Sequence, residues 1–318
     1  MRGRVQLETV GSLLLKDNAL GDPRTRTVPV YLPPSYGGER GRRYPVIYYL
    51  AGFTGNGLTQ VNHNPWRENL AERFDRLIAQ GKAKEAVLVF PDCFTALGGS
   101  QYLDSPATGR YASHVVEELV PFIEDKLAVR RDAAGRAVMG KSSGGYGALM
   151  LAIRRPDVFQ HVVSHSGDML FEHCYLPDFP KFVARLGGKS AKALRDEFLK
   201  SKTKDRYDHV IPNTLAMAAC YSDGELPFDE RTAELKPVVW RRWKALDPVA
   251  HAAKLRKLTT VWFDAGRRDE FFLQLGARKL SDTLKKLKIR HVYEEHDFGH
   301  FDMAERYDVS LAFLSKRL

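Results

Sequence analysis

The stretch that begins at Gly135, GRAVMGKSSGGYGALM, matches two motifs with different chemistry. Gly135, Gly140, Lys141 and Ser142 fit G-x-x-x-x-G-K-S, in which backbone amides and a lysine hold the phosphates of a nucleotide. Gly140, Ser142 and Gly144 fit G-x-S-x-G, in which a sharp turn presents a serine hydroxyl for attack on a carbonyl group. The two motifs require a strand at different places, so the neighbouring residues distinguish them.

The order of elements around Ser142 favours the nucleophile motif. A phosphate-binding loop needs a strand before Gly135, but the residues there, VRRDAA, are charged and typical of a turn. The supposed loop contains Ala137–Met139, which are apolar and predict a buried strand. After the turn, GGYGALMLAI predicts a helix whose small first residues allow close packing. We expect Ser142 to be a nucleophile, and a nucleotide-binding P-loop protein is the weaker hypothesis.

A serine nucleophile needs a general base, normally histidine, and a carboxylate that fixes the tautomer of that histidine. Three carboxylates follow the apolar run Thr260–Phe263, namely Asp264, Asp269 and Glu270. Asp264 directly abuts the predicted strand, and Glu270 is expected to start the next helix. Asp269 lies in the loop between them and is the expected acid, with Asp264 as its first substitute.

Two histidines follow the last predicted strand, His291–Tyr293, in the segment EEHDFGHFDM. His300 comes after a glycine in a loop that precedes the final helix, so its ring is free to reach the serine. His296 lies nearer the strand end and is the second choice. The other histidines are expected in the core or on the surface, although His165 follows a strand and is a candidate to line the pocket.

The oxyanion that forms during attack on a carbonyl needs preorganised N–H donors. One donor is expected from the backbone of Ser143, at the start of the helix. The other is expected from the glycine-rich loop AGFTGNG that follows Val46–Leu50, where we favour the backbone N–H of Phe53. The alternative hypothesis is that these glycines only form a turn.

The elements that must position these residues alternate between apolar strands and amphipathic helices, which predicts an α/β fold with a mostly parallel central sheet flanked by helices. The predicted strands are Val28–Leu32, Val46–Leu50, Val87–Phe90, Ala137–Met139, Val162–Ser164, Thr260–Phe263 and His291–Tyr293. The clearest predicted helices are Pro65–Gln80, Ser113–Leu127, Phe271–Leu287 and Met303–Leu314.

The interval Gly167–Leu246 breaks this alternation. It contains helical pieces separated by prolines and glycines but no convincing strand. An insertion of this size between two sheet strands predicts a helical cap or lid over residues 167–246. We expect one domain over residues 1–318, with this insertion inside it.

Composition limits the class of protein. The net charge of +10 is spread along the chain without a nucleic-acid-binding motif, so we expect a solvated basic surface and no nucleic acid partner. No apolar run is long enough to cross a membrane, and no signal peptide is evident, so we expect a cytoplasmic protein. The three cysteines lack metal-binding spacing, which predicts buried thiols, with no metal and no cofactor.

The motifs together resemble the putative-esterase family of α/β-hydrolases, which includes esterase D (S-formylglutathione hydrolase), feruloyl esterases, enterochelin esterases and mycolyltransferases. The segments that carry the resemblance are VYLPPSY, YPVIYYLAGFTG, VFPD, GKSSGGYGAL, DAGRRDEF and FGHFD. The resemblance implies an α/β-hydrolase fold, a catalytic triad of Ser142, Asp269 and His300, and an oxyanion hole from the N–H groups of Phe53 and Ser143.

The expected activity is hydrolysis of a small-molecule carboxylic ester through an acyl-enzyme. An acyltransferase with the same triad is the main alternative, because composition does not separate water from an alcohol as the second acceptor. A non-catalytic binding module is disfavoured by the intact set of serine, aspartate and histidine. Two departures from many relatives, Ala51 before the glycine of the oxyanion loop and Lys141 before the nucleophile, leave the substrate open.

Overall fold

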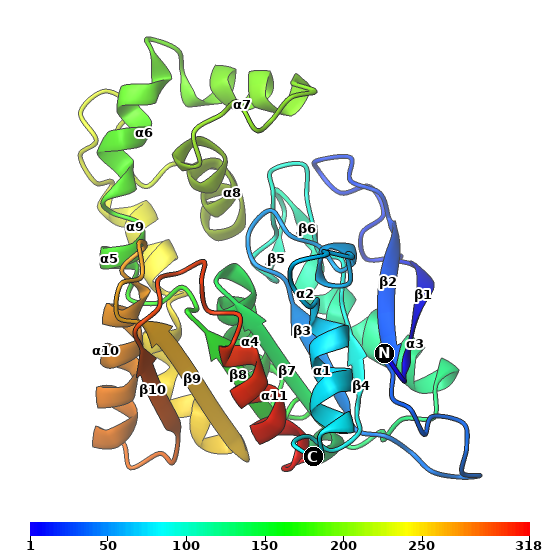
Figure 1. Ribbon diagram of the computed structural model, residues 1–318. Helices are drawn as coiled ribbons and strands as arrows, with labels where there is room; N and C mark the ends of the chain where they lie inside the picture. Colours follow the sequence, from blue (N-terminus) through cyan, green and yellow to red (C-terminus); the bar gives the residue numbers. More distant parts are fainter.

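The computed structural model describes residues 1–318 and builds them around one eight-stranded sheet (Figure 1). The strand order is β1-β2-β4-β3-β7-β8-β9-β10. The pairs β1-β2 and β2-β4 are antiparallel, and all pairs from β4 to β10 are parallel. The bounds of these strands are β1 Arg4–Gly11, β2 Thr25–Leu32, β3 Val46–Leu50, β4 Val87–Val89, β7 Arg136–Lys141, β8 His161–His165, β9 Thr260–Gly266 and β10 Val292–His296. The predicted mostly parallel sheet is therefore confirmed.

Helices cover both faces of the sheet. The helices outside residues 167–246 are α1 Leu70–Ala79, α2 Tyr111–Ser113 with the π-helical turn His114–Leu119 and α3 Val120–Lys126, α4 Ser143–Arg154, α10 Leu273–Lys286 and α11 Arg306–Ser315. Short 3-10 turns span Leu58–Gln60, Ala133–Gly135 and Pro248–Lys257, and a two-stranded ribbon pairs β5 Asp104–Ser105 with β6 Gly109–Arg110. None of the helices has the length and apolar character needed to span a bilayer.

Two apolar clusters fill the space between the sheet and its helices. Alternate side chains of β7 enter different clusters: Val138 joins the larger one with α3, α4 and α10, while Ala137 and Met139 join the smaller one with α1 and α11. This two-residue alternation is what a strand buried on both faces requires. The site elements are thus held by core packing on both sides.

Residues 167–246 contain five helices and no strand of the main sheet. These are α5 Phe171–Cys174, α6 Asp178–Leu186, α7 Ala191–Lys200, α8 Val210–Ser222 and α9 Pro237–Lys244. In Figure 1 the segment lies above the carboxyl ends of the central strands, with α6, α7 and α8 standing away from the sheet. This placement suits a cap over a site at that edge.

Several element boundaries differ from the sequence prediction. The edge strand β1 was not predicted, because it is exposed at alternate positions and is recruited only by antiparallel pairing with β2. Helix α1 begins at Leu70 rather than Pro65, because Asn69 caps it through a capping box with Glu72. The last strand runs to His296, which places this histidine on the strand instead of in the loop.

Candidate active site

Ser142 is the single residue between strand β7 and helix α4, and its backbone has φ 57° and ψ −126°. A positive φ is uncommon in non-glycine residues and marks a strained turn. Gly140 and Gly144 make the turn possible. A Cβ on Gly140 would overlap the backbone of Gly144, and a Cβ on Gly144 would overlap the carbonyl oxygen of Leu50. The sequence G-x-S-x-G therefore folds into the sharp strand-turn-helix that exposes the hydroxyl.

The loop after β3 lies against this turn. A Cβ added to Gly52 would be 3.3 Å from the carbonyl oxygen of Lys141 and 3.5 Å from Cβ of Ser142. The next residue, Phe53, has a backbone N–H that donates to no protein acceptor. Ser143 begins α4, where the first N–H groups have no partner within the helix. Two unused backbone donors thus lie close to Ser142, and an oxyanion needs such donors.

Asp269 and His300 are hydrogen-bonded to each other although they come from different loops. Nδ1 of His300 lies 2.8 Å from Oδ2 of Asp269, and both side chains are almost wholly buried. Nδ1–H therefore donates to the carboxylate, which leaves Nε2 free to accept a proton. Burial would raise the pKa of Asp269, but the hydrogen bond and charge of His300 lower it below its ordinary value. The carboxylate is thus ionised at neutral pH.

His300 and Ser142 line the same cavity. No hydrogen bond joins their side chains here, and in enzymes without bound substrate this contact is often long. The ring of His300 is packed edge-on between Phe271, at 4.8 Å, and Phe301, at 5.2 Å. These two rings hold the imidazole at the wall of the cavity that Ser142 also lines.

Glu270, which the sequence placed at a helix start, instead holds the histidine loop. Its Oε2 accepts the backbone N–H of His300 at 2.6 Å, and helix α10 begins only at Leu273. The loop also comes close to the end of β9, because a Cβ on Gly266 would overlap the carbonyl oxygen of Phe298. No sequence pattern indicates this bond, since it depends on how two loops meet.

The substitutes for the acid and the base are engaged elsewhere. Asp264 lies inside β9, and its carboxylate accepts from Nδ1 of His165 at 2.8 Å and from Nε of Arg306 at 2.7 Å. His165 is fully buried, its Nε2 pairs with Ser310, and it does not line the cavity as suggested from the sequence. His296 is buried 3.8 Å from Asp264 and is also absent from the cavity wall. Of the acids and bases considered from the sequence, Asp269 and His300 are the pair that is not engaged elsewhere.

The segment GGSQYLDSP supports the loop AGFTGNG that follows β3. Gln101 and Tyr102 both have positive φ, at 51° and 53°, which indicates a strained loop. The hydroxyl of Tyr102 donates to the carbonyl oxygen of Ala51 at 2.7 Å, and the N–H of Thr54 donates to Gly98 at 2.8 Å. The loop that carries Phe53 is therefore fixed from behind.

A buried polar cluster connects this support to the cap. The carboxylate of Asp168 accepts from Nε2 of Gln101 and from the hydroxyl of Tyr175, both at 2.9 Å. Tyr221 joins through Gln101 at 2.9 Å and Tyr175 at 3.0 Å. Burial raises the pKa of Asp168 above its ordinary value, with these hydrogen bonds opposing the shift. Neither Asp168 nor Gln101 was singled out from the sequence, because no motif contains them.

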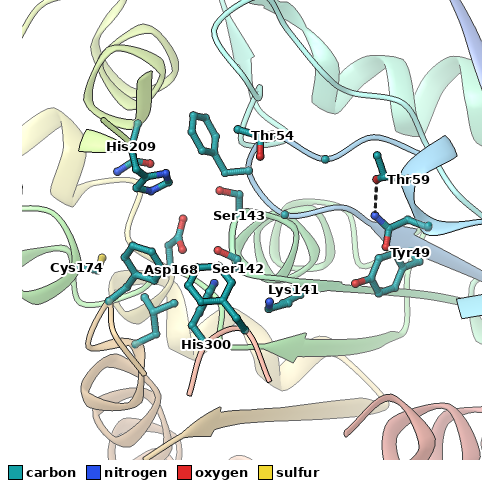
Figure 2. Close-up of a pocket in the computed structure, with 18 of the residues that line it drawn as sticks. Tyr49, Thr54, Thr59, Lys141, Ser142, Ser143, Asp168, Cys174, His209 and His300 are labelled. Carbon is teal, nitrogen blue, oxygen red and sulfur yellow. Dashed lines mark hydrogen bonds between the residues drawn. The ribbon is translucent and has the colours of Figure 1, made fainter. Parts of the chain in front are cut away.

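Ser142 lines a cavity of about 650 Å³, within the usual range for small-molecule sites. Figure 2 shows Ser142 and Ser143 near its centre, with His209, Asp168 and Cys174 on one side and Lys141 on the other. The ring of His209, from the cap, packs edge-on against Phe53 at 5.7 Å. The cap therefore contributes directly to the cavity wall.

Five large aromatic residues that an aromatic-acyl pocket could have used belong to the core instead. All five are buried, and none lines this cavity; they are Tyr102, Tyr111, Tyr146, Trp240 and Trp243. The aromatic rings that do line it are Phe53, Phe271, Phe301, Tyr49, Tyr175 and Tyr307.

Known proteins resemble this chain in sequence and in fold. The family described as "Putative esterase" matches residues 19–308. An endo-1,4-beta-xylanase/feruloyl esterase of Xylanibacter ruminicola is 26% identical over 227 residues, which are 69% of this chain and 28% of that protein. A solved ferulic acid esterase superposes with a TM-score of 0.64 at 20% identity, covering 100% of both chains. An S-formylglutathione hydrolase from Agrobacterium tumefaciens gives 0.61 at 18% identity, over 99% of this chain and 96% of that one.

The structural matches are below 25% identity and establish the fold, which is that of the α/β-hydrolase esterases. The chain spans between 28% and 59% of the length of the first curated relatives it matches, so the similarity does not extend to the whole of those proteins. The family match covers nearly the whole chain and agrees with the resemblance found in the motifs. This protein belongs to the "Putative esterase" family.

Proposed function

We propose that this protein hydrolyses small carboxylic esters through an acyl-enzyme formed on Ser142. The observation that carries the proposal is the buried pair of Asp269 and His300, joined at 2.8 Å, on the wall of the cavity that Ser142 enters from a strained turn. Membership of the esterase family supports the same reaction.

In the proposed mechanism, Nε2 of His300 accepts the proton of Ser142 as the hydroxyl oxygen attacks the ester carbonyl. The carbonyl oxygen becomes an oxyanion, which the N–H groups of Phe53 and Ser143 stabilise. Asp269 stabilises the imidazolium. His300 then returns the proton to the leaving alcohol, and a water molecule deprotonated by His300 cleaves the acyl-enzyme in the same way.

Substitution of Ser142 by alanine tests the proposal. Turnover of 4-nitrophenyl acetate by Ser142→Ala should fall to the background rate, with an unchanged circular dichroism spectrum. Ser201→Ala, in the cap at the end of α7, serves as the matched control and should keep wild-type turnover. Turnover by Ser142→Ala at the wild-type rate would contradict the proposal.

A further inference from the structure

One arm of the cavity carries a cation that the proposed reaction does not use. Lys141, the residue before Ser142, lines the cavity wall, and its side chain lies over the ring of Phe301. Tyr49 and Tyr307, which are hydrogen-bonded to each other, line the same cavity. Figure 2 shows Lys141 on the side of Ser142 that faces Tyr49, away from Asp168 and His209. We call the side of the cavity lined by Lys141, Tyr49, Phe301 and Tyr307 the Lys141 arm.

The ammonium group of Lys141 has no partner in the protein. It forms no hydrogen bond and no ion pair, and its nearest described contact is the ring of Phe301, 5.3 Å from Nζ. The hydroxyl of Tyr307, which accepts from Tyr49 at 3.0 Å, also has no acceptor of its own. The Lys141 arm therefore presents unused donors and a positive charge to whatever occupies it.

Nearby carboxylates do not neutralise this group by contact. Asp269, Glu270 and Asp302 act on Lys141 through charge, but none forms an ion pair within 4.0 Å. Asp269 and Glu270 already accept from the ring and the backbone of His300. A half-buried ammonium without a partner has a solvation cost that a bound anion would recover.

The opposite side of the cavity has the reverse character. Asp168 lines it, is almost fully buried, and points its cluster of hydrogen bonds toward the cap. A substrate anion on that side would meet a carboxyl group, whereas on the Lys141 side it would meet the ammonium. The charged groups that line the cavity therefore favour binding of a substrate anion on the Lys141 side.

We propose that the Lys141 arm is an anion-binding subsite, and that the preferred esters carry a carboxylate or phosphate on the part that occupies it. This inference rests on the proposed esterase function for its kinetic consequence, but the binding of an anion beside Ser142 does not require turnover. Lys141 is the residue that determines this specificity.

Paired substrates test the proposal without deciding beforehand which half of the ester enters the arm. For the acyl half, 4-nitrophenyl hemiadipate is compared with neutral 4-nitrophenyl 6-methylheptanoate. For the alcohol half, 3-acetoxybenzoate is compared with 3-acetoxybenzamide. In at least one pair, Lys141→Met should lower the ratio of kcat/KM for anionic over neutral ester by about 10- to 100-fold, as expected for a hydrogen bond between charged groups.

Two further variants make the result specific. Lys141→Arg, which keeps the charge, should retain a larger ratio than Lys141→Met. Lys82→Met, which removes an exposed lysine after α1, should leave both ratios at the wild-type value. Ratios in Lys141→Met within about twofold of wild type for both pairs would overturn the proposal, because a salt-bridge of this kind is worth more than that.

A binding measurement separates this inference from the proposed reaction. By calorimetry, Ser142→Ala should bind 3-acetoxybenzoate or the hemiadipate more tightly than its neutral partner, and the double variant with Lys141→Met should lose that preference. Anion binding that depends on Lys141 in a protein without esterase activity would refute the proposed function and support the subsite. Esterase activity without such binding or selectivity would refute the subsite alone.

Discussion

The hydrogen bond from the backbone of His300 to Glu270 gives a prediction that sequence motifs would not make. Glu270 does not belong to the proposed triad, yet its carboxylate accepts this N–H at 2.6 Å. Glu270→Ala leaves the backbone N–H of His300 without an acceptor. His300 as a whole residue is only 3% exposed. An unsatisfied buried donor costs about 1–3 kcal/mol.

The loop will relieve that cost by moving, and the movement displaces the imidazole from Ser142. If the whole cost appears in the transition state, kcat falls by about 5- to 150-fold for Glu270→Ala. Glu270→Gln keeps an acceptor but loses its charge, so a smaller decrease of about fivefold is expected. KM should change little in both variants, because the bond positions a catalytic group rather than the substrate.

The assay is steady-state hydrolysis of 4-nitrophenyl acetate, accompanied by thermal melting. Glu230→Ala is the matched control, since Glu230 accepts the backbone N–H of Ala191 at 2.8 Å in the cap. That control should lower the melting temperature without lowering kcat. If Glu270→Ala keeps kcat within about twofold of wild type, the histidine loop is positioned by other contacts and the reasoning is refuted.

Three further predictions follow from the same geometry. Asp269→Asn should lower kcat by about 10⁴-fold, because the amide favours the wrong tautomer of His300; a decrease below tenfold in steady-state assays would exclude Asp269 as the triad acid. Tyr102→Phe should lower kcat about fivefold, because the carbonyl of Ala51 loses its 2.7 Å donor and the oxyanion loop loosens, and an unchanged kcat would contradict this role. Lys141→Met should raise the melting temperature at pH 7. Burial lowers the pKa of Lys141 below 10.5, so its ammonium destabilises the native state until the pH rises through the folded pKa. The gain should therefore shrink toward pH 10.5, and a gain that grows with pH would contradict that sign.

The sequence could predict those parts of the fold that depend on the pattern of neighbouring residues. Apolar runs such as Val46–Leu50 are buried on both faces and were recognised by composition alone. The strand-turn-helix around Ser142 was predicted because the glycines on both sides of this residue are required by the turn itself. Edge strand β1 was missed because its pairing with β2, and not its own pattern, keeps it extended.

The contacts that could not be predicted from the sequence join residues that are far apart in the chain. Tyr102 reaches Ala51 and Gln101 reaches Asp168, pairs that lie 51 and 67 residues apart. Asp264 was a reasonable substitute for Asp269 by spacing, and only the structure shows its carboxylate committed to His165. Local patterns locate groups along the chain, whereas these partners are fixed by how the loops pack together.

The most direct test of the central claim is the site at which a fluorophosphonate reacts. Intact-mass and peptide mass spectrometry should find one phosphonyl group per chain, on Ser142, with loss of esterase activity in proportion to labelling. Prior treatment with substrate in excess should slow the labelling, and Asp269→Asn should slow it strongly. Full esterase activity in a protein whose Ser142 is labelled, or labelling confined to another residue such as Ser143, would contradict the account.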